Sequence, residues 1–165
     1  MNRSTRLAIG VLGLVCCCAV RAHALDVDRA SYKITLPEGA TVEKGDGEID
    51  ADHMTTVNLP NDSTMVVLVI DDKARASVAF DKMVNEYKSK VKEGSVDKSE
   101  SFVQPKATRA NAVTGRLNGV LITFDVGQID GKEKSFLVVF TYMQSKKAAT
   151  IEMVQKAMTT FVIKE

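Results

Sequence analysis

Two unbroken apolar runs constrain the fold of this chain more than any other feature. The first is MVVLVI at 65–70, bounded by turn-forming aspartates on both sides, and the second is FLVVF at 136–140. Neither run alternates with polar residues, so a strand formed by either one presents apolar side chains on both faces. Such a strand has to be covered on both faces. The two runs therefore predict a sheet with a layer packed on each side.

A hairpin is predicted around the second run. Residues 119–129 and 133–144 flank the dipeptide Asp130-Gly131, which is typical of a type I′ turn because both of its residues tolerate positive φ. Alternate residues of the first strand are apolar: Val120, Ile122, Phe124 and Val126. We expect this hairpin to lie in the middle of the sheet.

Shorter strands are indicated elsewhere in the chain. Residues 32–36 alternate between apolar and polar, which is the pattern of a half-buried strand. Weaker patterns at 56–59, 101–104 and 108–117 indicate modest strands, and the last of these ends at a turn signal, Asn118-Gly119. These strands complete a sheet that is mainly antiparallel.

Two segments have the spacing of amphipathic helices. Within 77–93 the apolar residues recur every three or four positions, Ser77 can cap the start, and Gly94 follows the end. Residues 146–160 show the same spacing. The elements together predict an α+β fold, a single-domain three-layer α-β-α sandwich with a mainly antiparallel sheet of about six strands and two principal helices.

The order of these elements resembles that of the PsbP-like family. The resemblance rests on the opening YKITLPEG at 32–39, the helix after an apolar strand, the hairpin at Asp130-Gly131, and a closing helix that ends at Thr160-Phe161. The family includes the lumenal extrinsic subunit of photosystem II and DcrB-type bacterial envelope proteins. The resemblance implies a non-catalytic exported domain that docks on a membrane or envelope complex.

The N-terminus has the three parts of an export signal. Two arginines precede an apolar run at 7–20, and the triplet AHA at 22–24 supplies the small residues that a signal peptidase recognises. The run is shorter than the roughly 20 apolar residues that a membrane-spanning helix needs. We therefore expect a cleaved signal peptide at 1–24 and a single exported domain at 25–165, with no transmembrane segment after the signal is removed.

All three cysteines, at positions 16–18, lie inside the expected signal peptide. The exported domain would therefore contain no thiol and no disulfide. Lipidation of one of these cysteines is an alternative, although none of them follows the small residue that a lipobox requires. Removal of the signal leaves 19 basic and 21 acidic residues, a net charge of −2. With no basic excess and no tryptophan, the domain is not expected to bind nucleic acid.

One acidic segment is a candidate metal site. Asp46, Glu48, Asp50 and Asp52 occupy alternating positions, and His53 follows them. In an extended segment these carboxylates share a face, where a hard cation or solvent relieves their mutual repulsion. Two interpretations stay open: a site for calcium or zinc, and a solvated acidic edge that discourages pairing with another strand. We expect no other cofactor.

Catalytic groups are scarce in the expected exported domain. Its single histidine is His53, and no Gly-x-Ser-x-Gly motif occurs. The leading hypothesis is a non-catalytic accessory or binding domain that contacts a protein partner at a membrane or envelope complex. The alternatives are a carrier of a small ligand or metal ion, and a carboxylate-dependent hydrolase. We expect the periplasm as its location, with secretion, the thylakoid lumen and a lipid anchor as alternatives.

Overall fold

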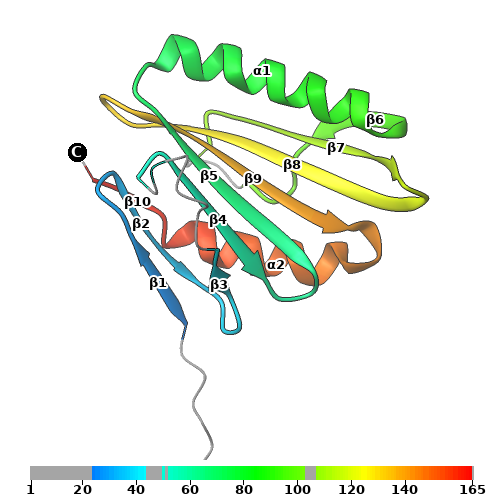
Figure 1. Cartoon of the computed structure of the whole chain (residues 1–165), viewed down its shortest axis with the longest axis horizontal. Helices are drawn as coiled ribbons and strands as arrows, with labels where there is room; N and C mark the ends of the chain where they lie inside the picture. The colour runs from blue at the N-terminus through cyan, green and yellow to red at the C-terminus, as the bar shows by residue number, and fades with distance from the viewer. Residues whose placement is uncertain (1–23, 44–49, 51, 103–106, 165) are drawn as a thin grey trace, which may run out of the picture.

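The computed structural model describes residues 24–43, 50, 52–102 and 107–164. The expected signal peptide lies outside these residues, apart from Ala24, and stays a prediction. The described residues form two antiparallel sheets and two long helices (Figure 1). Among these residues, no helix is both long enough and apolar enough to cross a membrane.

The larger sheet has seven strands in the order β3-β4-β5-β9-β8-β7-β6. They are β3 (Thr41–Val42), β4 (Met54–Leu59), β5 (Ser63–Ile70), β6 (Lys92–Lys98), β7 (Arg109–Leu117), β8 (Val120–Asp130) and β9 (Ser135–Met143). The two apolar runs of the sequence pair with each other at the centre of the sheet, where Val67 lies opposite Val138. The β8-β9 hairpin is also central, so its predicted position is confirmed.

The two helices lie on opposite faces of the larger sheet (Figure 1). On one face α1 (Lys73–Lys90) packs mainly over β7 and β8. On the other face α2 (Lys147–Thr159) follows the short helix η1 (Gln144–Lys146) and packs against β9 and the smaller sheet. The smaller sheet has the order β1-β2-β10, with β1 (Leu25–Asp28), β2 (Tyr32–Leu36) and β10 (Val162–Ile163). The predicted three-layer sandwich is confirmed, although the described residues form ten strands in two sheets rather than about six in one.

Each face of the larger sheet has its own hydrophobic core. On the α2 side Tyr32 stacks on Phe161 with ring centres 5.4 Å apart, and Phe136 contacts both rings edge-on. On the α1 side Tyr87 stacks on Phe124 with ring centres 4.3 Å apart. The free energy gained by burying apolar surface on both sides explains why the central strands contain so few polar residues.

The first helix begins and ends earlier than the sequence pattern predicted. The carboxylate of Asp72 accepts two backbone N–H groups of the first turn, at 2.7 and 3.2 Å, and so caps the helix. Ser77, the expected cap, lies inside the helix. The helix ends at Lys90 because Val91 is extended and buried in the α1-side core. The expected glycine cap is therefore wrong, and Gly94 lies in β6.

Strand β6 was not predicted, because its residues are mostly exposed and polar and show no apolar alternation. The strand predicted at 101–104 is wrong where the structure describes it, since Ser101 and Phe102 lie in a bend. This bend leads from the edge strand β6 back across the α2 side of the sheet, where both residues are buried.

The predicted type I′ turn at Asp130-Gly131 is also wrong, although the hairpin itself is confirmed. Neither residue has a positive φ, and the loop is closed by a hydrogen bond from the N–H of Gly131 to the carbonyl of Lys134 at 2.8 Å. Positive φ values occur instead at Asn118 (51°) and Gly119 (84°), which connect β7 to β8 as a two-residue turn. The turn signal at Asn118-Gly119 is thus confirmed.

Candidate functional site

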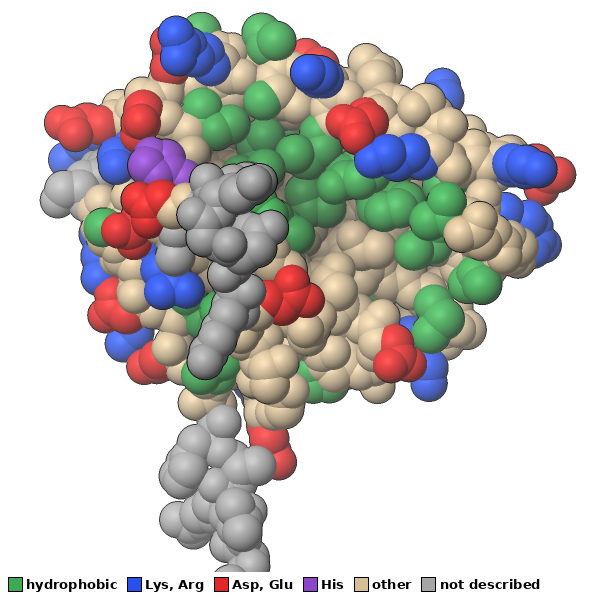
Figure 2. All heavy atoms as spheres, viewed as in Figure 1, with side chains coloured by type: hydrophobic (Ala, Val, Ile, Leu, Met, Phe, Trp, Pro, Cys, Tyr) green, Lys and Arg blue, Asp and Glu red, His purple; other side chains and the backbone are tan. Residues whose placement is uncertain are grey.

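An apolar surface lies beside α1, on the face of the sheet where β5 is only partly covered. Along β5 the residues that point to the α2 side are buried, whereas Val66, Leu68 and Ile70 on the α1 side are half-buried. Ala79 and Met83 of α1 are half-buried next to the same core. We call these five residues the β5 surface. Figure 2 shows a continuous band of hydrophobic side chains across this face of the molecule.

The position of α1 explains why the β5 surface is left open. Arg109 of β7 holds the helix through its guanidinium group, which lies 2.5 Å from the carboxylate of Asp81 and donates to the hydroxyl of Ser77 at 3.0 Å. The same guanidinium lies 4.4 Å from the ring centre of Phe80, a favourable cation-π contact. These contacts anchor α1 over β7, and the sheet surface over β5 is left partly exposed.

A polar pocket of about 300 Å³ lies on the opposite face, between the edge strands and the start of α2. Its floor is a row of hydroxyl side chains that crosses four neighbouring strands, because Ser95, Thr114, Thr123 and Tyr142 occupy successive paired positions on β6, β7, β8 and β9. Its other lining residues are Asp97, Lys98, Glu100, Ala112, Gln144 and Lys147. No sequence motif marks this row, since only the register of the strands brings the four residues together.

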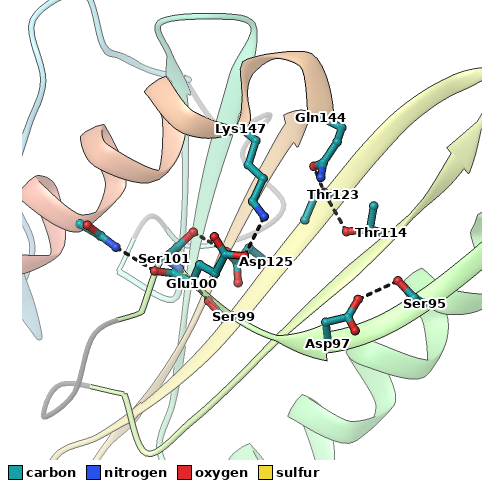
Figure 3. A network of polar contacts seen from close by, with 11 residues as sticks. Ser95, Asp97, Ser99, Glu100, Ser101, Thr114, Thr123, Asp125, Gln144 and Lys147 are labelled. Atoms are coloured by element: carbon teal, nitrogen blue, oxygen red, sulfur yellow. Dashed lines mark hydrogen bonds and ion pairs between the residues drawn. The ribbon is translucent and has the colours of Figure 1, made fainter.

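Hydrogen bonds order the side chains of the pocket (Figure 3). The hydroxyl oxygens of Thr114 and Thr123 lie 2.9 Å apart, and Thr123 donates to the amide oxygen of Gln144 at 2.9 Å. At the mouth, the ammonium group of Lys147 and the carboxylate of Glu100 form an ion pair at 2.7 Å. The pocket therefore presents hydroxyl, amide and paired charged groups within a small volume.

A buried carboxylate lies behind the pocket. Asp125 is fully buried on β8, and the hydroxyl of Ser101 donates to its Oδ2 atom. Burial raises the pKa of Asp125, and its Oδ1 atom has no hydrogen-bond partner among the described residues. Burial raises the pKa of Tyr142 to about 12, and the nearby charge of Asp125 is the second contribution to this rise. Because Asp125 does not line the pocket, its carboxylate is not placed to act on a bound substrate.

The bend at 99–102 is tied to both the sheet and α2. The hydroxyl oxygen of Ser99 accepts the backbone N–H groups of Ser101 and Phe102, at 3.1 and 3.3 Å. The side chain of Gln155 on α2 donates to the carbonyl of Glu100 at 2.8 Å. These bonds, together with the contact between Ser101 and Asp125, fix Glu100 at the mouth of the pocket.

The structure describes only part of the predicted metal segment. Asp46 and Glu48 lie outside the described residues. Asp50 lies 3.4 Å from the imidazole of His53, while the carboxylate of Asp52 accepts the backbone N–H of Ala30 at 3.3 Å. Within the described part of the chain, no three acidic, histidine or cysteine side chains are grouped closely enough to hold a metal ion. Metal binding by the whole segment stays a prediction.

The arrangement of sheets, helices and surfaces defines the class of α+β sandwich domain that the PsbP-like resemblance indicated. No family model and no curated protein sequence matches the chain. Among solved structures, the Ran-binding protein Mog1p of Saccharomyces cerevisiae is similar, with a TM-score of 0.57 and 12% identity over 86% of this chain and 96% of that one.

Two further solved structures share the architecture. LpqN, described as involved in cell envelope biogenesis of Mycobacterium tuberculosis, has a TM-score of 0.56 and 12% identity over 87% of this chain and 91% of its own. Cyanobacterial PsbP (CyanoP) of Synechocystis sp. PCC 6803 has a TM-score of 0.51 and 10% identity over 95% and 98%. At these identities the matches show a common fold, and the predicted likeness to PsbP is confirmed at that level.

Proposed function

We propose that this chain is an exported, non-catalytic accessory domain that binds a protein partner at a membrane or envelope complex through the β5 surface. The observation that carries the proposal is the incomplete cover of β5, a central strand whose apolar residues are half-buried on the α1 side. Contiguous exposed apolar patches on a folded domain mark interaction sites more often than single exposed side chains do.

A partner that covers the β5 surface would gain free energy from the burial of apolar side chains. Completing the burial of one such partly exposed valine, leucine or isoleucine side chain contributes about 0.5 kcal/mol. Val66, Leu68 and Ile70 are adjacent on one rigid strand and need no rearrangement to be contacted. A few apolar side chains at the centre of an interface supply most of its binding energy. An apolar segment of a partner laid along β5 would cover all three.

The comparisons support the kind of function rather than the partner. Mog1p is described as a Ran-binding protein, and LpqN is described as involved in cell envelope biogenesis. Binding to another protein is therefore within the repertoire of the fold, and the expected signal peptide favours the periplasm for this chain. One fold hosts many functions, so the assignment to this chain rests on the β5 surface.

The positions of the titratable groups favour a non-catalytic function. The carboxylate with a raised pKa, Asp125, is fully buried and bonded to Ser101 rather than open to a ligand. His53 is exposed, and its imidazole lies beside the carboxylate of Asp50 rather than beside a serine hydroxyl. A hydrolase with Asp125 as its catalytic group would need an opening through which the substrate reaches this carboxylate, and Asp125 does not line the polar pocket.

Affinity purification from the native host tests the proposal. The tagged full-length chain is expressed at its natural level, and retained proteins are identified by mass spectrometry. We expect a stoichiometric envelope or membrane protein with the unaltered chain, and at least tenfold less of it with the variant Leu68→Ser. The control Val162→Ser changes an exposed apolar residue of the smaller sheet and should retain the partner.

Two results would contradict the proposal. One is equal retention of the partner by Leu68→Ser and by the unaltered chain, provided that near-ultraviolet circular dichroism shows the same fold for both. The other is recovery of the bait alone after cross-linking in cells. Mass spectrometry of the purified bait also identifies its N-terminal residue. This residue should be Leu25 if the signal peptide is cleaved as predicted.

A further inference from the structure

We propose that the polar pocket between β6–β9 and the start of α2 is a binding site for a saccharide. The pocket lies on the face opposite the β5 surface, so this site is independent of the proposed protein contact. Three features of the pocket lead to this ligand class: the mixture of donors and acceptors, the pairing of its charges, and its shape.

The first feature is the mixture of donors and acceptors on the floor. A hydroxyl group donates one hydrogen bond and accepts two. Ser95 and Thr123 already donate their protons within the pocket, so toward a ligand these two hydroxyls act as acceptors. Since Thr123 donates to the amide oxygen of Gln144, the amide N–H groups of Gln144 are not used in that bond. Asp97 accepts from Ser95 through one carboxylate oxygen, at 2.8 Å, and its second oxygen takes no part in that bond. A ligand with several hydroxyl groups can match such closely spaced donors and acceptors.

The second feature is the charge of the lining. It contains two carboxylates, Asp97 and Glu100, and two ammonium groups, Lys98 and Lys147. Because Glu100 and Lys147 are paired at 2.7 Å, the mouth has no region of a single charge sign. A small anion or cation would meet a like charge as closely as an opposite one, and an amino acid would need the two signs apart. A neutral polyhydroxylated molecule has neither problem.

The third feature is a second hollow that continues the first. A shallower depression of about 440 Å³ shares Glu100, Gln144 and Lys147 with the polar pocket and is also lined by Ala148 and Ile151 of α2. The polar pocket lies at the small end of the range for ligand sites, which suits one sugar ring. The apolar wall of the second hollow suits the less polar face of a second ring. The shape therefore fits the end of an oligosaccharide chain.

Asp125 acts in this site as a positioning residue. It holds Ser101, and the bend at 99–102 in turn places Glu100 at the boundary of the two hollows. A buried carboxylate is costly unless it is hydrogen-bonded, and the bond from Ser101 offsets part of that cost while it fixes the bend.

Titration by nuclear magnetic resonance tests the site. The ¹⁵N-labelled exported chain is titrated separately with N-acetylglucosamine, glucose, chitobiose, glycine and sodium phosphate. We expect saturable shifts of the backbone amides of Thr123, Gln144 and Lys147 with at least one sugar, with a dissociation constant on the order of 1 mM for a single ring and tighter binding for a disaccharide.

Variants separate the site from the rest of the molecule. Thr123→Val and Gln144→Ala should each weaken sugar binding by about fivefold or more, because each removes one hydrogen-bonding group from the floor. Lys164→Ala, which alters an exposed lysine just after β10, should leave binding unchanged. Asp125→Asn should weaken binding while keeping the amide shifts of the floor in the free protein.

The proposal is overturned if no sugar shifts these amides up to about 50 mM, or if glycine or phosphate alone gives the saturable shifts. Saturable shifts confined to residues outside the two hollows would equally overturn it. None of these outcomes bears on the protein partner, since the purification with Leu68→Ser reports on the opposite face.

Discussion

The hydroxyl of Ser101 donates a hydrogen bond to the buried carboxylate of Asp125, although the two residues lie 24 positions apart in the sequence. This contact joins an irregular bend to the middle of a central strand. It also places an ionisable group inside the α2-side layer, where its charged form is poorly solvated. The pH dependence of stability should therefore contain a contribution from this pair.

Replacement of Asp125 by asparagine should change how the free energy of unfolding varies with pH. Because burial raises the pKa of Asp125, the folded state binds its proton more tightly than the unfolded state does. The unaltered chain should thus lose stability as the pH rises from about 4 through the raised pKa, and Asp125→Asn should lack this loss. Urea unfolding at several pH values between about 3.5 and 7 measures the difference, and parallel curves for the two proteins would rule the prediction out.

Replacement of Gly127 by alanine should destabilise the protein through a steric overlap. A Cβ atom at this position would overlap the ring of Phe102, whose nearest atoms would lie 2.4 to 2.6 Å from it. We expect a loss of about 1 to 3 kcal/mol in the free energy of unfolding, measured by chemical denaturation.

The matched test of that prediction is a double-mutant cycle with Phe102→Ala. Removal of the ring should relieve the overlap, so the double variant should lose less stability than the sum of the two single variants. Additive losses would show that the cost of Gly127→Ala arises elsewhere.

Arg109 should contribute more to stability than its ion pair alone explains. The pair with Asp81 is largely exposed, and exposed pairs contribute little. The guanidinium also covers the ring of Phe80 and bonds to Ser77, and Arg109→Ala removes all three contacts. We expect a loss of about 1 to 2 kcal/mol for Arg109→Ala and at most about half of that for Asp81→Ala. Equal losses in the free energy of unfolding for the two variants, measured by thermal or urea unfolding, would contradict this expected difference.

The acidic segment that ends at His53 can be tested for metal binding directly. Our proposal from the sequence is that Asp50 and His53 are among the ligands of a calcium or zinc ion. Isothermal titration calorimetry should then give a dissociation constant tighter than about 1 mM, weakened by Asp50→Asn and unchanged by Glu86→Gln, which alters an exposed carboxylate of α1. Affinity no better than millimolar would leave the solvated acidic edge as the better interpretation.

Strand β5 shows how far the sequence alone predicts this fold. Its unbroken apolar run predicted a central strand with a layer on each side, and both features are confirmed. The incomplete cover of Val66, Leu68 and Ile70 could not be predicted, because it depends on where α1 docks. That position is set by contacts of Arg109, which lies about 30 residues beyond the helix residues that it holds.

The polar pocket could not be predicted for a related reason. Ser95, Thr114, Thr123 and Tyr142 form a row only because three strand pairings bring them into register, and an isolated serine or threonine in a strand carries no such information. Strand β6 was missed altogether, so one side of the pocket was absent from the prediction. Local patterns sufficed for the central strands and α2, where apolar spacing is strong.

Photocrosslinking at position 68 is the sharpest test of the proposed protein contact. A photoreactive phenylalanine derivative replaces Leu68, and in a second variant Val162, and each chain is irradiated in cells of its own host. If the β5 surface binds a protein, position 68 should give one discrete cross-linked product that position 162 does not give. No product from position 68, or the same products from both positions, would contradict binding through this surface.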